Sequence, residues 1–138
     1  MSTWTQMEAD KAFRRAARSR RRAALASRIS RGARLCGLAV FDETERRGGA
    51  GRGVREIPLD AIKGTTEPNR AAQFDHAFRP AKLTRSRWQS VWMALHRGTT
   101  LPPIDVVQIG DTYAIRDGHH RVSVAKALGV PTIHAIVA

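Results

Sequence analysis

Residues 116–129 constrain the fold of this chain most, because they combine the end of a strand, a glycine turn and the start of a helix. Gly118 permits a sharp turn, and His119, His120 and Arg121 follow it in the first helical turn. The start of this helix would carry unpaired backbone N–H groups and the positive end of the helix dipole. Two imidazoles and a guanidinium would project into the same place. The stretch therefore predicts a site for an anion.

A simpler interpretation of the same residues stays open, in which Asp117 caps the helix and the following polar side chains are solvated. Successive helix positions lie about 100° apart, so only some of the three side chains can face one ligand. We favour His119 and Arg121 over His120. Gly129 ends the predicted helix as a left-handed C-cap.

The motif resembles that of the ParB/sulfiredoxin-like superfamily, whose members are known as ParB-like nuclease domains. Residues 54–62 (Val-Arg-Glu-Ile-Pro-Leu-Asp-Ala-Ile) resemble the first strand and turn of that superfamily, and residues 101–104 (Leu-Pro-Pro-Ile) the approach to its central hairpin. The resemblance covers residues 54–138. It rests on Asp117, Gly118, His119, His120 and Arg121, followed by Val122, Val124, Ala125, Leu128 and Gly129.

This resemblance implies a nucleotide ligand. In chromosome-partitioning members a Gly-x-x-Arg box holds the triphosphate of CTP, which implies phosphate contacts for Gly118, His119, His120 and Arg121. Those members usually carry an acidic residue after the glycine, and sulfiredoxins carry a reactive cysteine in this turn, whereas this chain has His119. The order Asp-Gly-His-x-Arg is closer to free-serine kinases, which implies a metal or proton-transfer role for Asp117. CTP, ATP or ADP with Mg²⁺ are the expected ligands.

A second loop completes the expected site. In the superfamily the loop after the first strand faces the phosphate turn, which implies that Glu67, Asn69 and Arg70 are its partners. Arg70 would bind phosphate and Glu67 would serve in metal binding or proton transfer, so Glu67 and Asp117 are catalytic candidates if the protein is an enzyme. Ordinary polar loop residues are the alternative. The spacing of the other histidines (His76, His96 and His134) predicts no protein metal site.

Positive charge is concentrated in the first part of the chain. The 138 residues include 24 Lys and Arg and 12 Asp and Glu. Residues 1–55 contain 14 of the basic residues and 5 of the acidic ones, a net charge of +9. Residues 5–31 predict a long helix with one apolar side that packs and one basic side that repels itself. The apolar side carries Ala9, Phe13, Ala16, Ala17 and Ala24, with Arg20 as an exception, and the basic side carries Lys11, Arg14, Arg15, Arg18, Arg21 and Arg22.

Such a basic face is typical of a surface that binds a polyanion. We favour nucleic acid as the partner, DNA first and RNA second. A solvated helix or tail is one alternative. An acidic membrane or protein surface is another, although the apolar side is mostly alanine.

Glycines divide the chain. Residues 46–53 predict a Gly/Arg linker between a basic helical arm, residues 1–45, and a compact domain, residues 54–138. No signal-peptide pattern and no run of eighteen apolar residues is found, so we expect a cytoplasmic protein that does not enter a membrane. The single Cys36 predicts a small buried residue in a reducing compartment.

The compact domain is predicted to be α+β with a small mixed sheet. Strands are expected at residues 54–59, 104–109, 112–116 and 132–137, and helices at 84–97 and 119–128. Trp88 and Trp92 should face the core with Val91 and Leu95. Residues 63–83 are expected to be loop-rich, with Phe74 and Phe78 pinning a short helix. The apolar residues 35–41 fit either a strand or a helix.

Three functions follow from these patterns. The first is a ParB-like, chromosome-partitioning-like protein that binds nucleotide phosphate in the motif and DNA through the basic arm. The second is an enzyme, either a small phosphotransferase or a weak nuclease. The third is an RNA- or ribosome-binding scaffold whose phosphate site is vestigial. The oligomeric state is not predicted.

Overall fold

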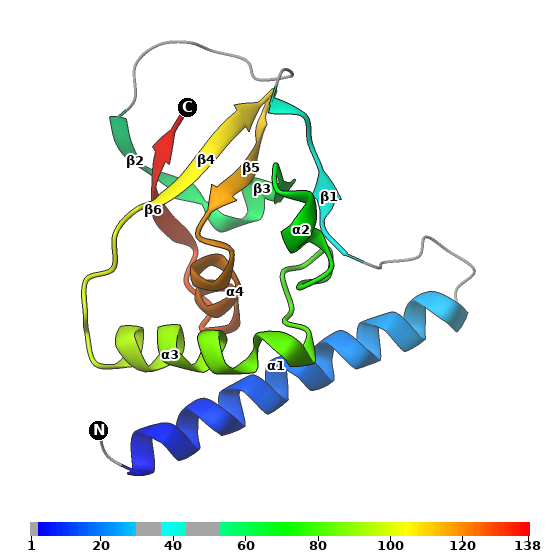
Figure 1. Cartoon of the computed structure of the whole chain (residues 1–138), viewed down its shortest axis with the longest axis vertical. Helices are drawn as coiled ribbons and strands as arrows, with labels where there is room; N and C mark the ends of the chain where they lie inside the picture. The colour runs from blue at the N-terminus through cyan, green and yellow to red at the C-terminus, as the bar shows by residue number, and fades with distance from the viewer. Residues whose placement is uncertain (1–2, 30–36, 44–52) are drawn as a thin grey trace.

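The computed structural model describes residues 3–29, 37–43 and 53–138, which form one mixed sheet with helices on one side of it (Figure 1). The helices are α1 Thr3–Ile29, α2 Pro68–Ala71, α3 Arg85–His96 and α4 His119–Ala127, with 3-10 turns η2 Leu59–Ala61 and η3 Lys82–Thr84. The strands are β1 Ala39–Val40, β2 Gly53–Pro58, β3 Ile62–Thr65, β4 Ile104–Ile109, β5 Thr112–Asp117 and β6 Thr132–Val137.

The sheet has the strand order β1-β3-β5-β4-β6-β2. Its β1/β3, β3/β5 and β4/β6 pairs are parallel, whereas β4/β5 and β2/β6 are antiparallel. The predicted α+β fold with a mixed sheet is confirmed, and the apolar residues left open between strand and helix contribute the short β1. Because β5 lies inside the sheet, the motif that follows it begins at a fixed point of the core.

Helix α4 packs its apolar side on the sheet. Val122 is fully buried with Ile104 and Val106 of β4 and Ile115 of β5. Each buried aliphatic side chain of this kind stabilises the fold by about 1.5–3 kcal/mol relative to exposure. The start of α4 is therefore held rigidly against two central strands.

The expectation for residues 63–83 was partly wrong. Residues Ile62–Thr65 form β3, which was not expected, whereas the expected short helix is α2, and Phe74 and Phe78 are buried in the loop after it with Ala71 packed against their cluster. Phe78 has a φ of +62°, which is rare for a residue with a side chain. The Asp75 carboxylate holds this loop by accepting hydrogen bonds from the backbone N–H groups of Ala77 at 3.0 Å and Arg79 at 2.8 Å.

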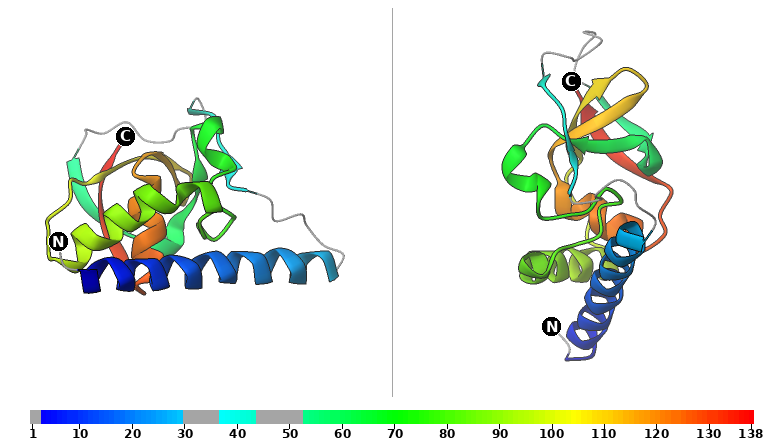
Figure 2. Two further views of the ribbon diagram at one scale, coloured as in Figure 1. Left: turned by 60° about the horizontal axis from the view of Figure 1, so that its bottom comes forward. Right: turned by 90° about the vertical axis from the view of Figure 1, so that its right-hand side faces the viewer.

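Helix α1 packs on α3, as Figures 1 and 2 show. Phe13 meets the Trp88 ring edge-on with ring centroids 5.6 Å apart, and Trp92 and Val124 join the same cluster. The indole N–H of Trp88 donates to Ser123 Oγ at 2.9 Å, so its one polar atom is satisfied. The predicted core role of both tryptophans is confirmed.

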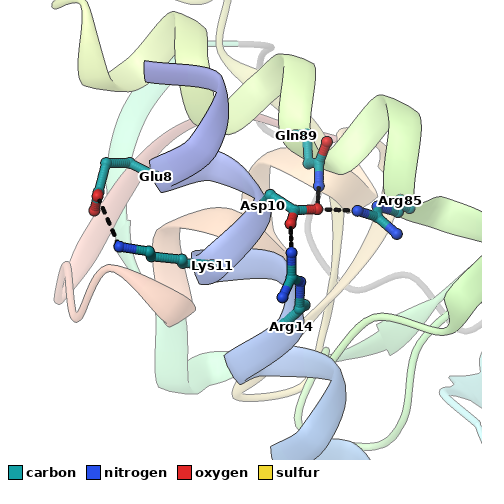
Figure 3. Close-up of polar contacts among 6 residues, drawn as sticks. All are labelled: Glu8, Asp10, Lys11, Arg14, Arg85 and Gln89. Carbon is teal, nitrogen blue, oxygen red and sulfur yellow. Dashed lines mark hydrogen bonds and ion pairs between the residues drawn. The ribbon is translucent and has the colours of Figure 1, made fainter. Parts of the chain in front are cut away.

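A polar clamp strengthens the contact between α1 and α3 (Figure 3). The Asp10 carboxylate of α1 accepts hydrogen bonds from the Arg85 guanidinium and from Gln89 Nε2, the latter at 3.2 Å. Its second oxygen accepts from Arg14, one turn along α1. Asp10 thus forms hydrogen bonds with side chains of both helices.

The six basic residues predicted to share one face of α1 are all exposed. Ala24 is also exposed, contrary to the prediction, because the last turns of α1 project beyond α3 (Figure 2). Most of the predicted linker, residues 46–53, and Cys36 lie outside the described residues, so the division into arm, linker and domain stays a prediction. No helix in the described parts of the chain is long and apolar enough to cross a membrane.

Candidate functional site

The motif opens onto a cleft of about 570 Å³ between α2, α3, the end of β5 and the start of α4. Four arginines and two carboxylates line it, which makes the cleft electropositive. Its walls are Glu67, Asn69, Arg70, Gln73, Arg87, Val91, Arg116, Asp117, Gly118, His119, His120 and Arg121. The structure therefore brings together every residue predicted for the phosphate site.

Gly118 creates the turn into the cleft. Its φ of +115° is the left-handed conformation that glycine tolerates, and an added Cβ would lie 2.8 Å from the Ile104 Cβ. The backbone N–H of Val122 donates to Gly118 O at 3.1 Å, which makes it the first hydrogen bond of α4. The N–H groups of the three preceding helical residues are left for a ligand, at the positive end of the helix dipole.

Arg121 forms part of the wall and is braced from behind. Its Nη1 donates to Pro103 O at 3.2 Å and to Pro102 O, and its Nη2 donates to Asp117 Oδ2 at 3.4 Å. The resemblance implied a phosphate contact for Arg121. The structure adds a second role, since this side chain also fixes residues 102–103 against the motif.

His119 is buried, with 4% of its surface exposed. Its Nε2 lies 2.7 Å from Thr65 Oγ1 of β3, and its ring stacks on Phe74 with centroids 6.3 Å apart. Burial, the positive charge of Arg70 and the neighbouring His120 lower its pKa from 6.5 to about 4, although Asp117 opposes the shift. His119 is therefore a neutral imidazole at pH 7.

His120 has a similar environment, although the sequence favoured it less than His119. It meets Phe74 edge-on with centroids 5.2 Å apart. Burial followed by the charges of Arg87 and Arg70 lowers its pKa to about 4. Burial is thus the main cause that keeps both imidazoles uncharged, with Arg70 contributing at both and Arg87 at His120 alone.

Arg70 and Arg87 are the guanidiniums most available to a ligand. Arg70 donates to Gln73 Oε1 at 3.3 Å, and no described residue forms a hydrogen bond or ion pair with Arg87. Neither Arg87 nor Arg116 was among the residues predicted for the site. Arg87 precedes the core residue Trp88 on a predicted helix, so the sequence predicts that its side chain points away from the core. The sequence does not predict that a cleft lies on that side of the helix.

Glu67 and Asp117 are the carboxylates that line the cleft. No group of three or more His, Cys, Asp or Glu side chains in the described ranges is arranged to hold a metal ion. Magnesium prefers about six oxygen ligands and shares them with substrate phosphates. If a nucleotide brought Mg²⁺ into the cleft, Glu67 and Asp117 would be its carboxylate ligands, and phosphate and water would have to supply the others.

Comparison with known proteins agrees with the resemblance found in the sequence. Residues 43–138 match the ParB N-terminal domain family. The chain therefore belongs to this family, and the match begins eleven residues before the range expected from sequence. A solved sulfiredoxin from Arabidopsis thaliana is similar, with 23% identity and a TM-score of 0.41 over 62% of this chain and 84% of that one. No curated protein gives a significant match.

Proposed function

We propose that the protein is a cytoplasmic, DNA-associated member of the ParB N-terminal domain family that binds a nucleotide through its phosphates. The observation that carries the proposal is the start of α4, where free backbone N–H groups face a cleft lined by four arginines. Backbone donors and guanidiniums together favour a ligand with several negative oxygens. CTP, ATP and ADP with Mg²⁺ are the candidates, and a triphosphate matches the charge best.

The neutral imidazoles support a phosphate ligand. An uncharged histidine donates one hydrogen bond without adding a charge that would repel the neighbouring guanidiniums. In this proposal His119 and His120 contribute uncharged lining to the cleft, while Arg70 and Arg87 supply the attraction. The bound anion would in turn raise both histidine pKa values, because it offsets the charge of Arg70 at both and of Arg87 at His120.

The exposed basic face of α1 supports the nucleic-acid part of the proposal. None of its six predicted basic residues lines the cleft, so the chain carries two separate positive regions. Neutralising DNA phosphates releases counterions, which gives affinity that falls steeply with salt. A structured RNA would be attracted by the same charge, and a comparison of the two at equal salt distinguishes them.

The experiment for the cleft is calorimetric titration of the full chain with CTP, ATP and ADP in the presence of Mg²⁺. Arg70→Gln should abolish or strongly weaken binding, because it removes a partly buried guanidinium whose one side-chain hydrogen bond goes to Gln73. Arg97→Gln is the matched control, since Arg97 is exposed and lies outside the cleft. Equal affinities in the two variants, or no binding of any nucleotide, would reject the proposed site.

Phosphotransfer is a second candidate, favoured by the presence of Glu67 and Asp117 in the same cleft as the phosphate turn. Asp117 is highly exposed, so it can reach a ligand. Turnover of ATP with free serine, or of DNA, that disappears in Asp117→Asn while nucleotide binding persists would establish catalysis. Binding without turnover would leave the protein a nucleotide-binding module.

A further inference from the structure

The outer side of α1 carries an exposed tryptophan in line with its basic residues. Trp4 has 60% of its surface exposed, an unusual state for an indole. Positions 4, 11, 15, 18 and 22 are separated by seven, four, three and four residues, so they share one helix face. We call this exposed set the outer stripe of α1: Trp4, Lys11, Arg15, Arg18 and Arg22.

Aromatic rings are layered beneath Trp4. His96 at the end of α3 stacks on the buried Trp92, with centroids 4.7 Å apart and planes 11° from parallel. Trp4 lies next in the series, with its centroid 5.9 Å from that of His96. The planes of Trp4 and His96 are tilted by 46°, so the Trp4 indole contacts one ring, that of His96, and remains mostly exposed.

We propose that the outer stripe of α1 binds single-stranded nucleic acid, with an unpaired base stacked on Trp4 and the phosphates along the basic residues. The inference rests on the proposed nucleic-acid role of α1 and specifies the form of the strand. Every base offers a flat face to an aromatic ring, whereas a duplex keeps those faces covered inside its own stack. The four cations give the charge complementarity, although Glu8 pairs with Lys11 at 3.5 Å and Asp60 lines the same cavity as Lys11 and Arg15.

The length of the stripe suits a short strand. Trp4 and Arg22 are eighteen residues apart, which corresponds to about 27 Å along a helix. Stacked nucleotides advance about 3.4 Å each, so roughly eight of them span the stripe. The base on Trp4 would fix one end of the strand.

The test compares three fluorescent probes of about twelve units on the full chain: oligothymidylate, an abasic sugar-phosphate strand and a duplex of the same length. Trp4→Ala should weaken oligothymidylate binding about fivefold or more and leave the abasic strand unchanged. Trp4→Phe should restore most of the loss. In the unmodified protein, oligothymidylate should quench tryptophan fluorescence more than the abasic strand does, since Trp88 and Trp92 are buried.

Different outcomes reject different claims. If Arg15→Gln and Arg18→Gln weaken all three probes while Trp4→Ala weakens none, the nucleic-acid role stands and base stacking is rejected. Tighter binding of the duplex than of oligothymidylate also rejects base stacking on Trp4. If the arginine variants bind all probes like the unmodified protein, the nucleic-acid role itself fails. Binding to phosphatidylserine vesicles but to none of the probes would assign the stripe to a membrane surface and overturn both.

Discussion

His119 and Thr65 are joined by a hydrogen bond of 2.7 Å between the imidazole Nε2 and the hydroxyl Oγ1. The same hydroxyl accepts the backbone N–H of Glu67 at 2.9 Å. One buried side chain of β3 therefore ties the phosphate turn to the loop that carries the second half of the cleft. The Thr65 hydroxyl is thus one direct link between the two halves of the cleft, beside the pairing of β3 with β5.

Thr65→Val should break this link while keeping the shape of the side chain. A buried imidazole nitrogen and a backbone N–H lose their partner, which costs about 1–3 kcal/mol of unfolding free energy. Nucleotide binding should weaken with it. Thr65→Ser keeps the hydroxyl and is the control in urea unfolding and calorimetry. Indistinguishable behaviour of the two variants would show that the bond does not hold the loop.

Gly118→Ala should destabilise the protein by about 3 kcal/mol, because the left-handed φ is strained for alanine and the new Cβ collides with Ile104. Gly129→Ala is a matched control, since its φ of +77° is also left-handed but no atom lies within 4 Å of an added Cβ. It should cost about 1 kcal/mol. Thermal or urea unfolding measures the difference, and equal losses would contradict the packing argument.

Stability should fall as the solution is acidified from about pH 6.5 to pH 4. The pKa values of His119 and His120 are lowered from 6.5 to about 4, so across this interval the unfolded chain binds protons that the folded chain does not. Their contribution is complete above pH 6.5 and is lost toward pH 4. Urea unfolding as a function of pH measures it.

The matched variants for this pH dependence are the double change His119→Gln with His120→Gln and the single change His134→Gln. The double variant should show a flatter pH profile in this interval. His134 is exposed and outside the cleft, so its variant should keep the original slope. A double variant with an unchanged slope would mean that other groups cause the loss.

Asp10→Ala should loosen α1 from α3, because it removes the acceptor for Arg85, Gln89 and Arg14. We expect a loss of about 1–2 kcal/mol and faster amide hydrogen exchange in α1. Glu8→Ala removes a more exposed pair with Lys11 and should change stability by less than about 0.5 kcal/mol. Equal exchange rates in both variants would show that apolar packing alone holds α1.

Local signals in the sequence predicted the elements around the site. The hairpin of β4 and β5, the helices α3 and α4, and the glycine turn between β5 and α4 follow from periodicity and turn residues. The cleft residues on the second loop came from the resemblance. The hairpin, the two helices and the glycine turn are determined by neighbouring residues along the chain, whereas the second loop is not.

The missed features depend on contacts between distant residues. Strand β3 has four residues, and its pairing with β5 connects Thr65 to Ile115, fifty positions away. Phe78 takes a left-handed conformation that no local pattern indicates. The place of Arg87 in the cleft depends on how α3 packs beside α4, which is a property of the assembled core.

Helix α3 serves both positive regions of the molecule. Arg87 and Val91 line the cleft, while Trp88 and Trp92 are covered by α1. A shortened chain without α1 would expose two indoles to water. Helix α3, which carries Arg87 in the cleft wall, would lose the packing that holds it. Loss of nucleotide binding in such a fragment would therefore reflect a disturbed cleft wall. The contributions of the two positive regions have to be distinguished by changing surface side chains in the whole protein.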